Sequence, residues 1–379
     1  MRTLRSIFTP VLVSLFFLLS TFYAAPCQDN RLILSNTKKG LWSDKKEIEI
    51  NNELIIGKEY SAEADMFSYI RDIALDQQDN LYVVDSMELC VKIFDKNGAF
   101  VRTFGGEGQG PGEFQTIDAV CWSRKDNFLY IADRSNQRIS WFSTDGLFKG
   151  SEKTDKFKAT IEGICCLDDG RFVLTARFAG DRISKYKIYV TSHNLKNVIA
   201  EIEEKFPIYA VGAAVSPKFS DVGTLQGERI YYTSPSEYKI FVLDSEFQKQ
   251  MTIEKTHPRM FEPNYVGGFY IDFNSIETLM SIEDRYIVGV QSTLIKEIPR
   301  FKEKRELIEF VYMPDLREMR LKTVYQLDFY NKDFQFLGKF DIPEKMRLAG
   351  KDSQDRVYFI ENDPFPRIVR TQILIKDKT

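Results

Sequence analysis

The chain has 379 residues, of which 43% are hydrophobic and 13% aromatic, and its 52 Lys and Arg residues nearly balance its 55 Asp and Glu residues. This composition can bury one large core or two ordinary ones, and it excludes a disordered or collagen-like chain. With a pI of about 5.8, the chain has no excess of basic residues to neutralise a phosphate backbone, so nucleic acid is not an expected partner.

The N-terminal segment has the order of features found in a secretory signal. Arg2 and Arg5 precede an apolar run over residues 11–23, and two small alanines follow. We therefore expect residues 1–27 to be a signal peptide that is removed, and the mature chain to be periplasmic, cell-surface or secreted. A retained membrane anchor is the alternative, because the apolar run is close to the lower length limit for a span.

Cys27 raises the question of a lipid anchor at the start of the mature chain. Pro26 stands where lipoprotein signals carry a small flexible residue, so we do not expect lipid at Cys27. Beyond residue 27 the apolar runs are short and broken by charge, which predicts no membrane span in the mature chain. We expect that chain to be a monomer.

The sequence contains five cysteines: Cys27, Cys90, Cys121, Cys165 and Cys166. A domain of this size does not need a disulfide framework. The adjacent Cys165 and Cys166 read as part of a strand, so their side chains point to opposite faces and cannot bridge to each other. We therefore expect buried free thiols, and no disulfide that folding requires.

Residues 73–105 read as four short strands separated by turn residues. Part of this unit recurs 48 residues later, with Tyr82 matched to Tyr130 and Asp85 matched to Asp133. A repeat of this length with four strands per unit is typical of a β-propeller, in which each blade buries its faces against its neighbours.

Later units are recognised by one residue in the second strand of each. These markers are Tyr82, Tyr130, Phe172, Tyr231, Tyr286 and Tyr358. The fold is therefore predicted to be all-β, a six-bladed β-propeller of four-stranded antiparallel blades that occupies residues 28–379 as a single domain. We expect an insertion in blade five over residues 292–322. A seventh blade within residues 28–69 or 256–280 is the alternative.

The ring closure can also be predicted. The chain ends on the third strand of blade six, residues 367–376, so that blade lacks its outer strand. Residues 47–56 have spare strand character, and we expect this N-terminal strand to complete the last blade. Such a closure protects an exposed sheet edge.

Several segments resemble NHL repeats over residues 70–146. They are Ile73–Asp76, Asn80–Ser86, Lys92–Gly98, Phe100–Phe114 and Leu129–Ile139. The resemblance is closest to exported bacterial six-bladed propellers of this kind. It implies a binding platform, since NHL propellers serve as protein-binding, RNA-binding and sensor domains, and one branch is a zinc-dependent lyase acting on hydroxyglycine peptides.

The sequence departs from that lyase branch, whose zinc site is rich in histidine. Only His193 and His257 are present, and no CxxC occurs, so a three-imidazole site cannot form. We expect His193 to lie in an exposed hairpin turn. Calcium-dependent lactonase-like propellers are a second relative by architecture, in which Asp85, Asp133, Glu361 and Asn362 would be the candidate ligands.

Two sequence features that suggest chemistry have a structural interpretation. Residues 105–112, Gly-Gly-Glu-Gly-Gln-Gly-Pro-Gly, look like a phosphate cradle, but they lead from an outer strand into the next blade, so we interpret them as a blade connection. Asp85 and Asp133 end the second strands of their blades, where we expect each carboxylate to accept backbone N–H groups. Their counterparts are Thr175, Ser234, Gly289 and Glu361.

We place the functional surface on the face where the loops between second and third strands and the blade connections emerge, here named the funnel face. The candidate ligand-binding residues are Asp85, Asp133, Arg134, Arg177 and Glu361. No catalytic or metal residue is assigned, and no cofactor is expected. The insertion at 292–322 is predicted to act as a lid over the funnel, and a loop that packs on a blade edge without a binding role is the alternative.

The favoured function is a non-catalytic platform for a protein, peptide or glycan ligand, because the local signatures of the common hydrolases are absent. The alternative is a metal-dependent hydrolase or lyase with a carboxylate-lined funnel site that holds one divalent ion such as calcium.

Overall fold

The computed structural model describes residues 32–36, 40–42, 45–59, 66–178, 185–204, 221–225, 229–234, 238–255, 264–266, 269–271, 274–293, 323–342 and 345–377. Residues 32–379 belong to one compact unit. The expected signal peptide and residues 294–322 of the expected insertion lie outside the described residues. Within the described part of the chain, no helix is long and apolar enough to cross a membrane.

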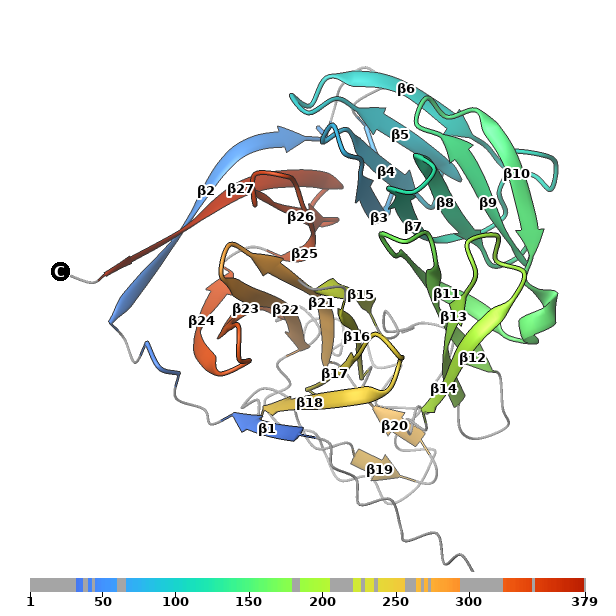
Figure 1. The fold of residues 1–379 in the computed structure, drawn as a ribbon. Helices are drawn as coiled ribbons and strands as arrows, with labels where there is room; N and C mark the ends of the chain where they lie inside the picture. The colour runs from blue at the N-terminus through green and yellow to red at the C-terminus, as the bar shows by residue number, and fades with distance from the viewer. Residues whose placement is uncertain are drawn as a thin grey trace, which may run out of the picture. The chain divides into compact units, whose positions relative to one another are not determined.

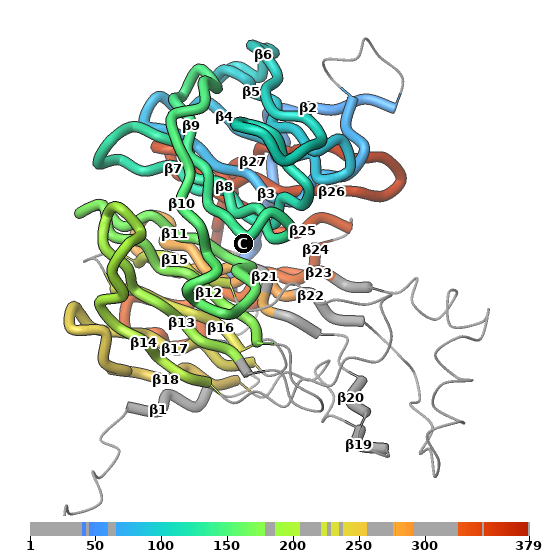
Figure 2. The backbone as a smooth tube through the Cα atoms, turned by 90° about the vertical axis from the view of Figure 1, so that its right-hand side faces the viewer, coloured from blue at the N-terminus to red at the C-terminus, as the bar shows by residue number. Residues whose placement is uncertain are grey.

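The unit consists of six antiparallel four-stranded blades that follow one another in chain order (Figures 1 and 2). Blade 1 contains β3 (Ile70–Leu75), β4 (Leu81–Asp85), β5 (Cys90–Phe94) and β6 (Phe100–Gly105). Blade 2 contains β7 (Ile117–Ser123), β8 (Phe128–Asp133), β9 (Arg138–Ser143) and β10 (Phe148–Lys153). Blade 3 contains β11 (Thr160–Cys166), β12 (Phe172–Phe178), β13 (Lys185–Thr191) and β14 (Val198–Glu204).

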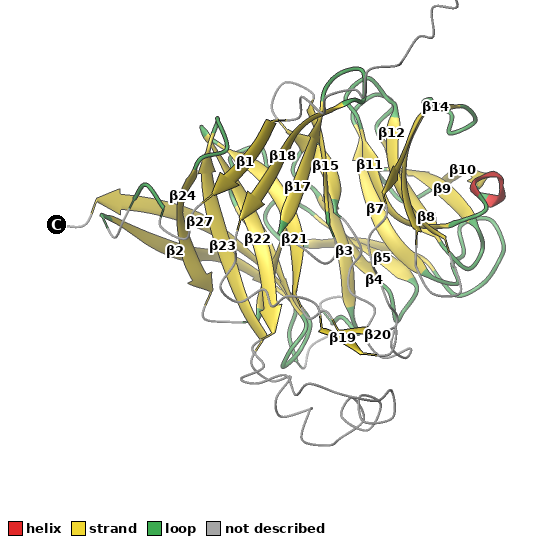
Figure 3. Cartoon of the chain, turned by 90° about the horizontal axis from the view of Figure 1, so that it is seen from below, coloured by secondary structure: helices red, strands yellow, loops and turns green. Residues whose placement is uncertain are grey.

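The later blades have the same four-stranded plan. Blade 4 contains β15 (Val222–Leu225), β16 (Arg229–Thr233), β17 (Lys239–Leu243) and β18 (Lys249–Lys255), and blade 5 contains β21 (Asn274–Ile282), β22 (Arg285–Thr293), β23 (Thr323–Asn331) and β24 (Phe336–Ile342). Blade 6 contains β25 (Met346–Lys351), β26 (Val357–Glu361), β27 (Arg367–Asp377) and the N-terminal β2 (Lys46–Ile56). Outside the blades, β19 (Asn264–Val266) pairs with β20 (Phe269–Ile271), and a 3-10 turn spans Asp155–Phe157, the one helical element among the described residues (Figure 3).

The blades form a closed ring. The innermost strands contact one another in the cyclic order β3, β7, β11, β15, β21, β25 and back to β3. Hydrophobic clusters occupy all six junctions between neighbouring blades. At the closing junction, Ile73 and Val83 of blade 1 pack with Tyr358 and Ile360 of blade 6. Each blade therefore buries its two faces only by packing against two others.

The six marker residues lie on β4, β8, β12, β16, β22 and β26, the second strand of every blade, and all are buried. The six-bladed prediction is thus confirmed, and the seven-bladed alternative is wrong.

Two of the marker residues show why tyrosine recurs at this position. The hydroxyl of Tyr82 donates to Asp76 at 2.8 Å, and that of Tyr130 donates to Asp126 at 2.5 Å. A buried ring thus keeps its polar end hydrogen-bonded in the turn before its strand.

The predicted closure by the N-terminal strand is also confirmed. β2 pairs antiparallel with β27 from Lys46 opposite Asp377 to Ile56 opposite Ile368. The segment before it contacts the outer strands of two further blades. The strand β1 (Leu32–Asn36) pairs in parallel with β18 of blade 4, and the N–H of Trp42 donates to Leu337 of blade 5 at 2.8 Å. The described parts of residues 32–56 therefore contact blades 4, 5 and 6 in turn.

The expectation of free thiols is wrong for two of the cysteines. Cys121 on β7 and Cys166 on β11 form a disulfide with a Cα–Cα distance of 6.0 Å. The predicted alternation of side chains along the strand explains why Cys166, and not Cys165, forms the bond. Cys166 faces the core between blades 2 and 3, whereas Cys165 packs against the core between blades 3 and 4. Cys90 and Cys165 are free thiols, and burial raises the pKa of each to about 12.

Candidate functional site

Asp85 and Asp133 end β4 and β8, and both side chains are almost fully buried. Asp85 accepts a hydrogen bond from the backbone N–H of Ser68 at 2.7 Å. Asp133 accepts the backbone N–H of Thr116 at 3.0 Å and the side-chain amide of Asn136 at 2.6 Å. Both carboxylates therefore hold the loops of the funnel face in place, which is the structural role expected for them.

The glycine-rich segment 105–112 connects β6 of blade 1 to β7 of blade 2, as expected. Arg138 on β9 holds this connection in place by donating hydrogen bonds to backbone carbonyl groups of the connection. Its Nη1 donates to Gln109 at 2.9 Å, and its Nη2 donates to Gly110 at 2.9 Å and to Glu113 at 2.6 Å. The segment is thus a fixed wall of the funnel face, with its carbonyls turned toward a buried guanidinium.

Three arginines and two carboxylates gather at the funnel-face end of blades 1–3: Arg71, Asp118, Arg134, Glu162 and Arg177, here named the arginine–carboxylate cluster. Asp118 Oδ1 lies 3.6 Å from Arg71 Nη2, and its Oδ2 lies 3.2 Å from Arg134 Nε. Arg177 Nε donates to Glu162 Oε1 at 2.5 Å. The carboxylates are 4% and 7% exposed, whereas Arg134 and Arg177 are 40% and 25% exposed. The negative charges of the cluster are therefore buried, and its positive charges are partly exposed at the surface.

Backbone irregularities occur where the two carboxylates lie. The pairing of β7 with β8 shifts register between Ile117 and Ala119, and that of β11 with β12 shifts between Ile161 and Gly163. Asp118 and Glu162 are the extra residues at these bulges. A bulge re-aims the side chain that it carries, which accounts for polar residues in the otherwise apolar inner strands.

Burial raises the pKa of both carboxyl groups. For Asp118, desolvation outweighs the opposing attraction of Arg134 and Arg71. For Glu162, desolvation likewise outweighs the attraction of Arg177. The two groups also repel each other weakly, so the cluster is one electrostatic unit in which arginines hold partly dehydrated carboxylates.

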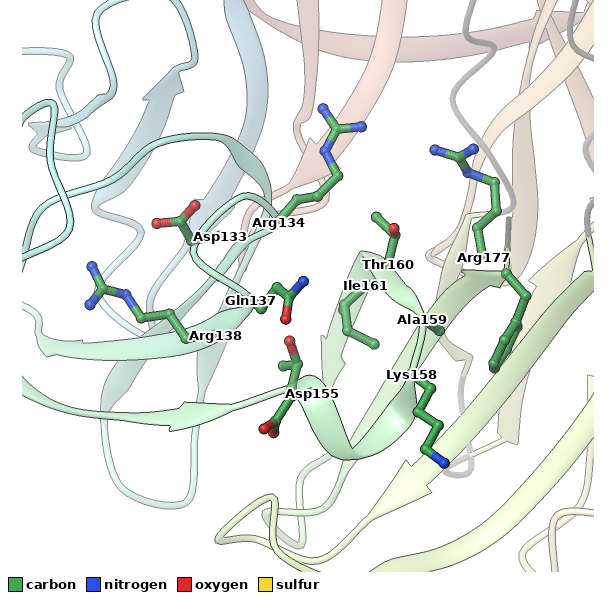
Figure 4. Close-up of a pocket in the computed structure, with 12 residues that line it drawn as sticks. Asp133, Arg134, Gln137, Arg138, Asp155, Lys158, Ala159, Thr160, Ile161 and Arg177 are labelled. Atoms are coloured by element: carbon green, nitrogen blue, oxygen red, sulfur yellow. The ribbon is translucent and has the colours of Figure 1, made fainter. Parts of the chain in front are cut away.

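Two pockets open on the funnel face of blades 2 and 3. The first, here named the arginine pocket, has a volume of about 310 Å³ and includes Arg134, Arg177 and Phe178 in its wall. In Figure 4, Arg134 and Arg177 extend in the same direction on either side of Thr160, and Lys158 extends the opposite way. Two arginines from neighbouring blades thus line one pocket.

The second pocket, here named the amide pocket, has a volume of about 350 Å³. Its lining residues are all polar: Gln109, Gln115, Ser135, Asn136, Gln137, Arg138, Lys153 and Asp155. Gln137, Arg138 and Asp155 line both pockets. Because they share these three residues, the two pockets lie side by side on the funnel face, and together they are here named the groove.

The structure brings together three of the five candidate residues. Asp133, Arg134 and Arg177 line the arginine pocket, whereas Asp85 and Glu361 line neither pocket of the groove. Glu361 is instead paired with Arg367 of its own blade.

The residues weighed as calcium ligands are engaged elsewhere. Asn362 links blade 6 to blade 1, since its Oδ1 accepts the N–H of Ile70 at 3.0 Å and its Nδ2 donates to the Ile70 carbonyl at 3.1 Å. Over the described ranges, no three His, Cys, Asp or Glu residues lie together as metal ligands would. His193 lies in the β13–β14 turn with its side chain 46% exposed, as expected, and His257 lies outside the described residues.

Sequence reasoning missed Asp118, Glu162 and the amide groups of the groove. A signal was present for the acids, since each is the one charged residue of an otherwise largely apolar inner strand. No local pattern marked Gln109, Gln115 and Gln137, because the first two lie in the β6–β7 connection and the third in the β8–β9 loop, and these loops meet only in the folded propeller.

The comparisons with known proteins agree with this fold. Residues 65–266 match the family model described as "Domain of unknown function (DUF4934)". The model is not that of an NHL repeat, so the NHL resemblance stays a prediction. No curated protein matches the sequence closely enough to count as a relative.

Two solved structures are similar over almost the whole chain. A Bacteroides fragilis NCTC 9343 protein named as an exported protein has 13% identity and a TM-score of 0.57, with 92% of this chain and 100% of that chain covered. A member of the DUF4221 family from Bacteroides vulgatus ATCC 8482 has 12% identity and a TM-score of 0.54, with 88% and 100% covered. At such identities the likeness concerns the fold alone. Because the matched segment spans more than half of the 379 residues, the chain belongs to the DUF4934 family.

Proposed function

We propose that this protein is an exported, NHL-like propeller that acts as a non-catalytic binding platform, with its ligand-binding site in the groove across blades 2 and 3. Export is supported by the signal-like residues 1–27 and by the name of the Bacteroides fragilis neighbour. The mature protein would then be the propeller of residues 28–379. The ligand is a protein, peptide or glycan that reaches the protein outside the cytoplasm.

The observation that carries this proposal is the groove itself. Its walls are held by buried groups: Asp133 fixes the loop after β8, and Arg138 fixes the glycine-rich connection. Exposed polar side chains then project from a rigid frame, which lowers the entropy lost when a ligand binds. Loops on a rigid scaffold are a common location of binding sites.

One observation favours the alternative of a carboxylate-based hydrolase or lyase. Asp118 and Glu162 are buried carboxyl groups with raised pKa values, and such groups are frequent in active sites. Both, however, are ion-paired with arginines of the cluster. A divalent cation at these carboxylates would have to displace Arg134 or Arg177, so the arrangement suits binding better than metal catalysis.

The test is a binding screen with a matched control. Mature protein is measured against immobilised acidic and neutral peptides and polysaccharides, together with the variants R134Q/R177Q and R124Q/K125Q. Arg124 and Lys125 lie in the β7–β8 turn, at the other end of β8, so the control removes the same charge from the opposite face. Binding that is lost in R134Q/R177Q and kept in R124Q/K125Q supports the proposal. Binding that both folded variants retain would contradict it, and a stoichiometric divalent ion retained through gel filtration would favour the enzyme.

A further inference from the structure

The amide pocket differs from an ordinary ligand pocket because its wall contains no apolar residue. Gln109, Gln115 and Gln137 are exposed, and over the described residues their side-chain amides make no hydrogen bond. Each amide offers two donors and an acceptor on one planar group. The pocket therefore presents hydrogen-bonding groups of both kinds to a ligand.

Asp155 adds an acceptor at the point where the two pockets meet. Its carboxylate accepts the N–H of Lys156, which orients it in the 3-10 turn. A carboxylate beside several amides suits a ligand that carries many hydroxyl groups, since each hydroxyl can both donate and accept. The amide pocket has no apolar wall of the kind that anchors a peptide side chain, and the apolar residues of the groove, Ala159, Ile161 and Phe178, all line the arginine pocket.

The arginine pocket adds a positive charge next to these amides. The arginine–carboxylate cluster contains three arginines against two acids, so it remains positive even when both acids are ionised. Arg134 contacts Asp118 through Nε, and its side chain and that of Arg177 line the same pocket and extend in the same direction (Figure 4). The guanidinium fork matches the two oxygens of a carboxylate.

We propose that the groove recognises an acidic saccharide, with a sugar carboxylate at Arg134 and Arg177 and the hydroxyls of adjoining sugar units at the glutamines of the amide pocket. This inference rests on the proposed function, because it names the ligand class of the same site. The three residues shared by the pockets place them side by side, so one oligosaccharide of several sugar units would contact both.

The test uses isothermal titration with three acidic oligosaccharides: a galacturonate trimer, a chondroitin tetrasaccharide and sialyllactose. Each is compared with its carboxyl-reduced form and with tri-glutamate. At least one acidic saccharide should bind the mature protein, and its carboxyl-reduced form should bind at least tenfold more weakly. This comparison uses the unaltered protein, so it does not depend on the folding of a variant.

The variants then assign the two ends of the groove. R134Q/R177Q should weaken the acidic saccharide at least tenfold, and Q109A/Q115A/Q137A should weaken it severalfold, while R124Q/K125Q changes nothing. Equal binding of the carboxyl-reduced saccharide, tighter binding of tri-glutamate, or no binding of any acidic saccharide would overturn the inference. If a neutral glycan or a peptide binds and is lost in R134Q/R177Q, the proposed function stands and the acidic saccharide is wrong.

Discussion

Cys121 and Cys166 join the inner strands of blades 2 and 3, three and four residues further along the same strands than Asp118 and Glu162. The disulfide thus ties together the two strands that carry the buried carboxylates of the arginine–carboxylate cluster. Since Arg134 and Arg177 are ion-paired with those carboxylates, the cross-link also limits how far the two sides of the arginine pocket can separate.

Loss of the disulfide should lower stability. The sequence separation of 45 residues corresponds to about 4 kcal/mol in the chain-entropy model, or a melting temperature lower by several degrees. Calorimetry of C121S/C166S, with C165S as the control for loss of a neighbouring thiol, measures this. Equal melting temperatures for wild type and C121S/C166S would show that the cross-link contributes nothing.

The closure of the ring by β2 can be tested by substituting two adjacent isoleucines of that strand. Ile56 is 5% exposed and lies in the core between blades 6 and 1, whereas Ile55 is 50% exposed. Ile56→Ala should cost about 3 kcal/mol of unfolding free energy because it leaves a cavity in that core, and Ile55→Ala less than about 1 kcal/mol. Denaturant titration compares them, and similar costs would contradict the burial of β2 in the ring.

The buried carboxylates predict a pH dependence of stability. The pKa of Asp118 and of Glu162 is raised in the folded protein, so the folded state retains protons that the unfolded state has lost. Stability from these groups is therefore full below their unfolded pKa values and falls as the pH rises through the folded values.

Substitution by the neutral amide should remove that dependence. Asp118→Asn and Glu162→Gln should each gain unfolding free energy relative to wild type as the pH rises from 4 to 7, on the order of 1 kcal/mol for each unit of pKa shift removed. Thermal denaturation at both pH values measures the change. A variant that loses stability relative to wild type over that range would reverse the assigned direction.

A buried ion pair at the junction of blades 4 and 5 gives a separate test of the packing. Lys255 Nζ lies 2.7 Å from Asp328 Oδ2, with side chains 2% and 0% exposed. Asp328→Ala leaves a buried ammonium without this partner and should cost about 3–5 kcal/mol. The double variant K255M/D328L should recover much of that loss, and a double variant as unstable as Asp328→Ala would show that the pair itself is required.

The fold could be predicted from the sequence because the same succession of short strands and turn residues recurs several times along the chain. Tyr82 and Tyr130 mark corresponding positions of two blades, and the prediction that blade six lacks an outer strand next to residues 367–376 pointed to residues 47–56. These are local patterns, and the structure follows them at β2 and β27.

The site was less accessible to sequence reasoning because it depends on which loops meet. Arg134 and Arg177 could be singled out as polar residues at the ends of second strands, but their carboxylate partners lie on other strands. The disulfide could not be predicted from the sequence for a similar reason, since Cys121 and Cys166 come together only when β7 and β11 pack side by side. Size and spacing carry no information on that contact.

Hydrogen–deuterium exchange tests the central claim most directly, namely that the groove across blades 2 and 3 is the binding surface. It compares the mature protein alone and with the tightest ligand of the titrations. We predict slower exchange in residues 106–116, 134–138 and 154–161, which frame the groove, and unchanged exchange in the turns at 95–98 and 124–127 on the opposite face. Protection confined to the opposite face or to other blades would contradict the account.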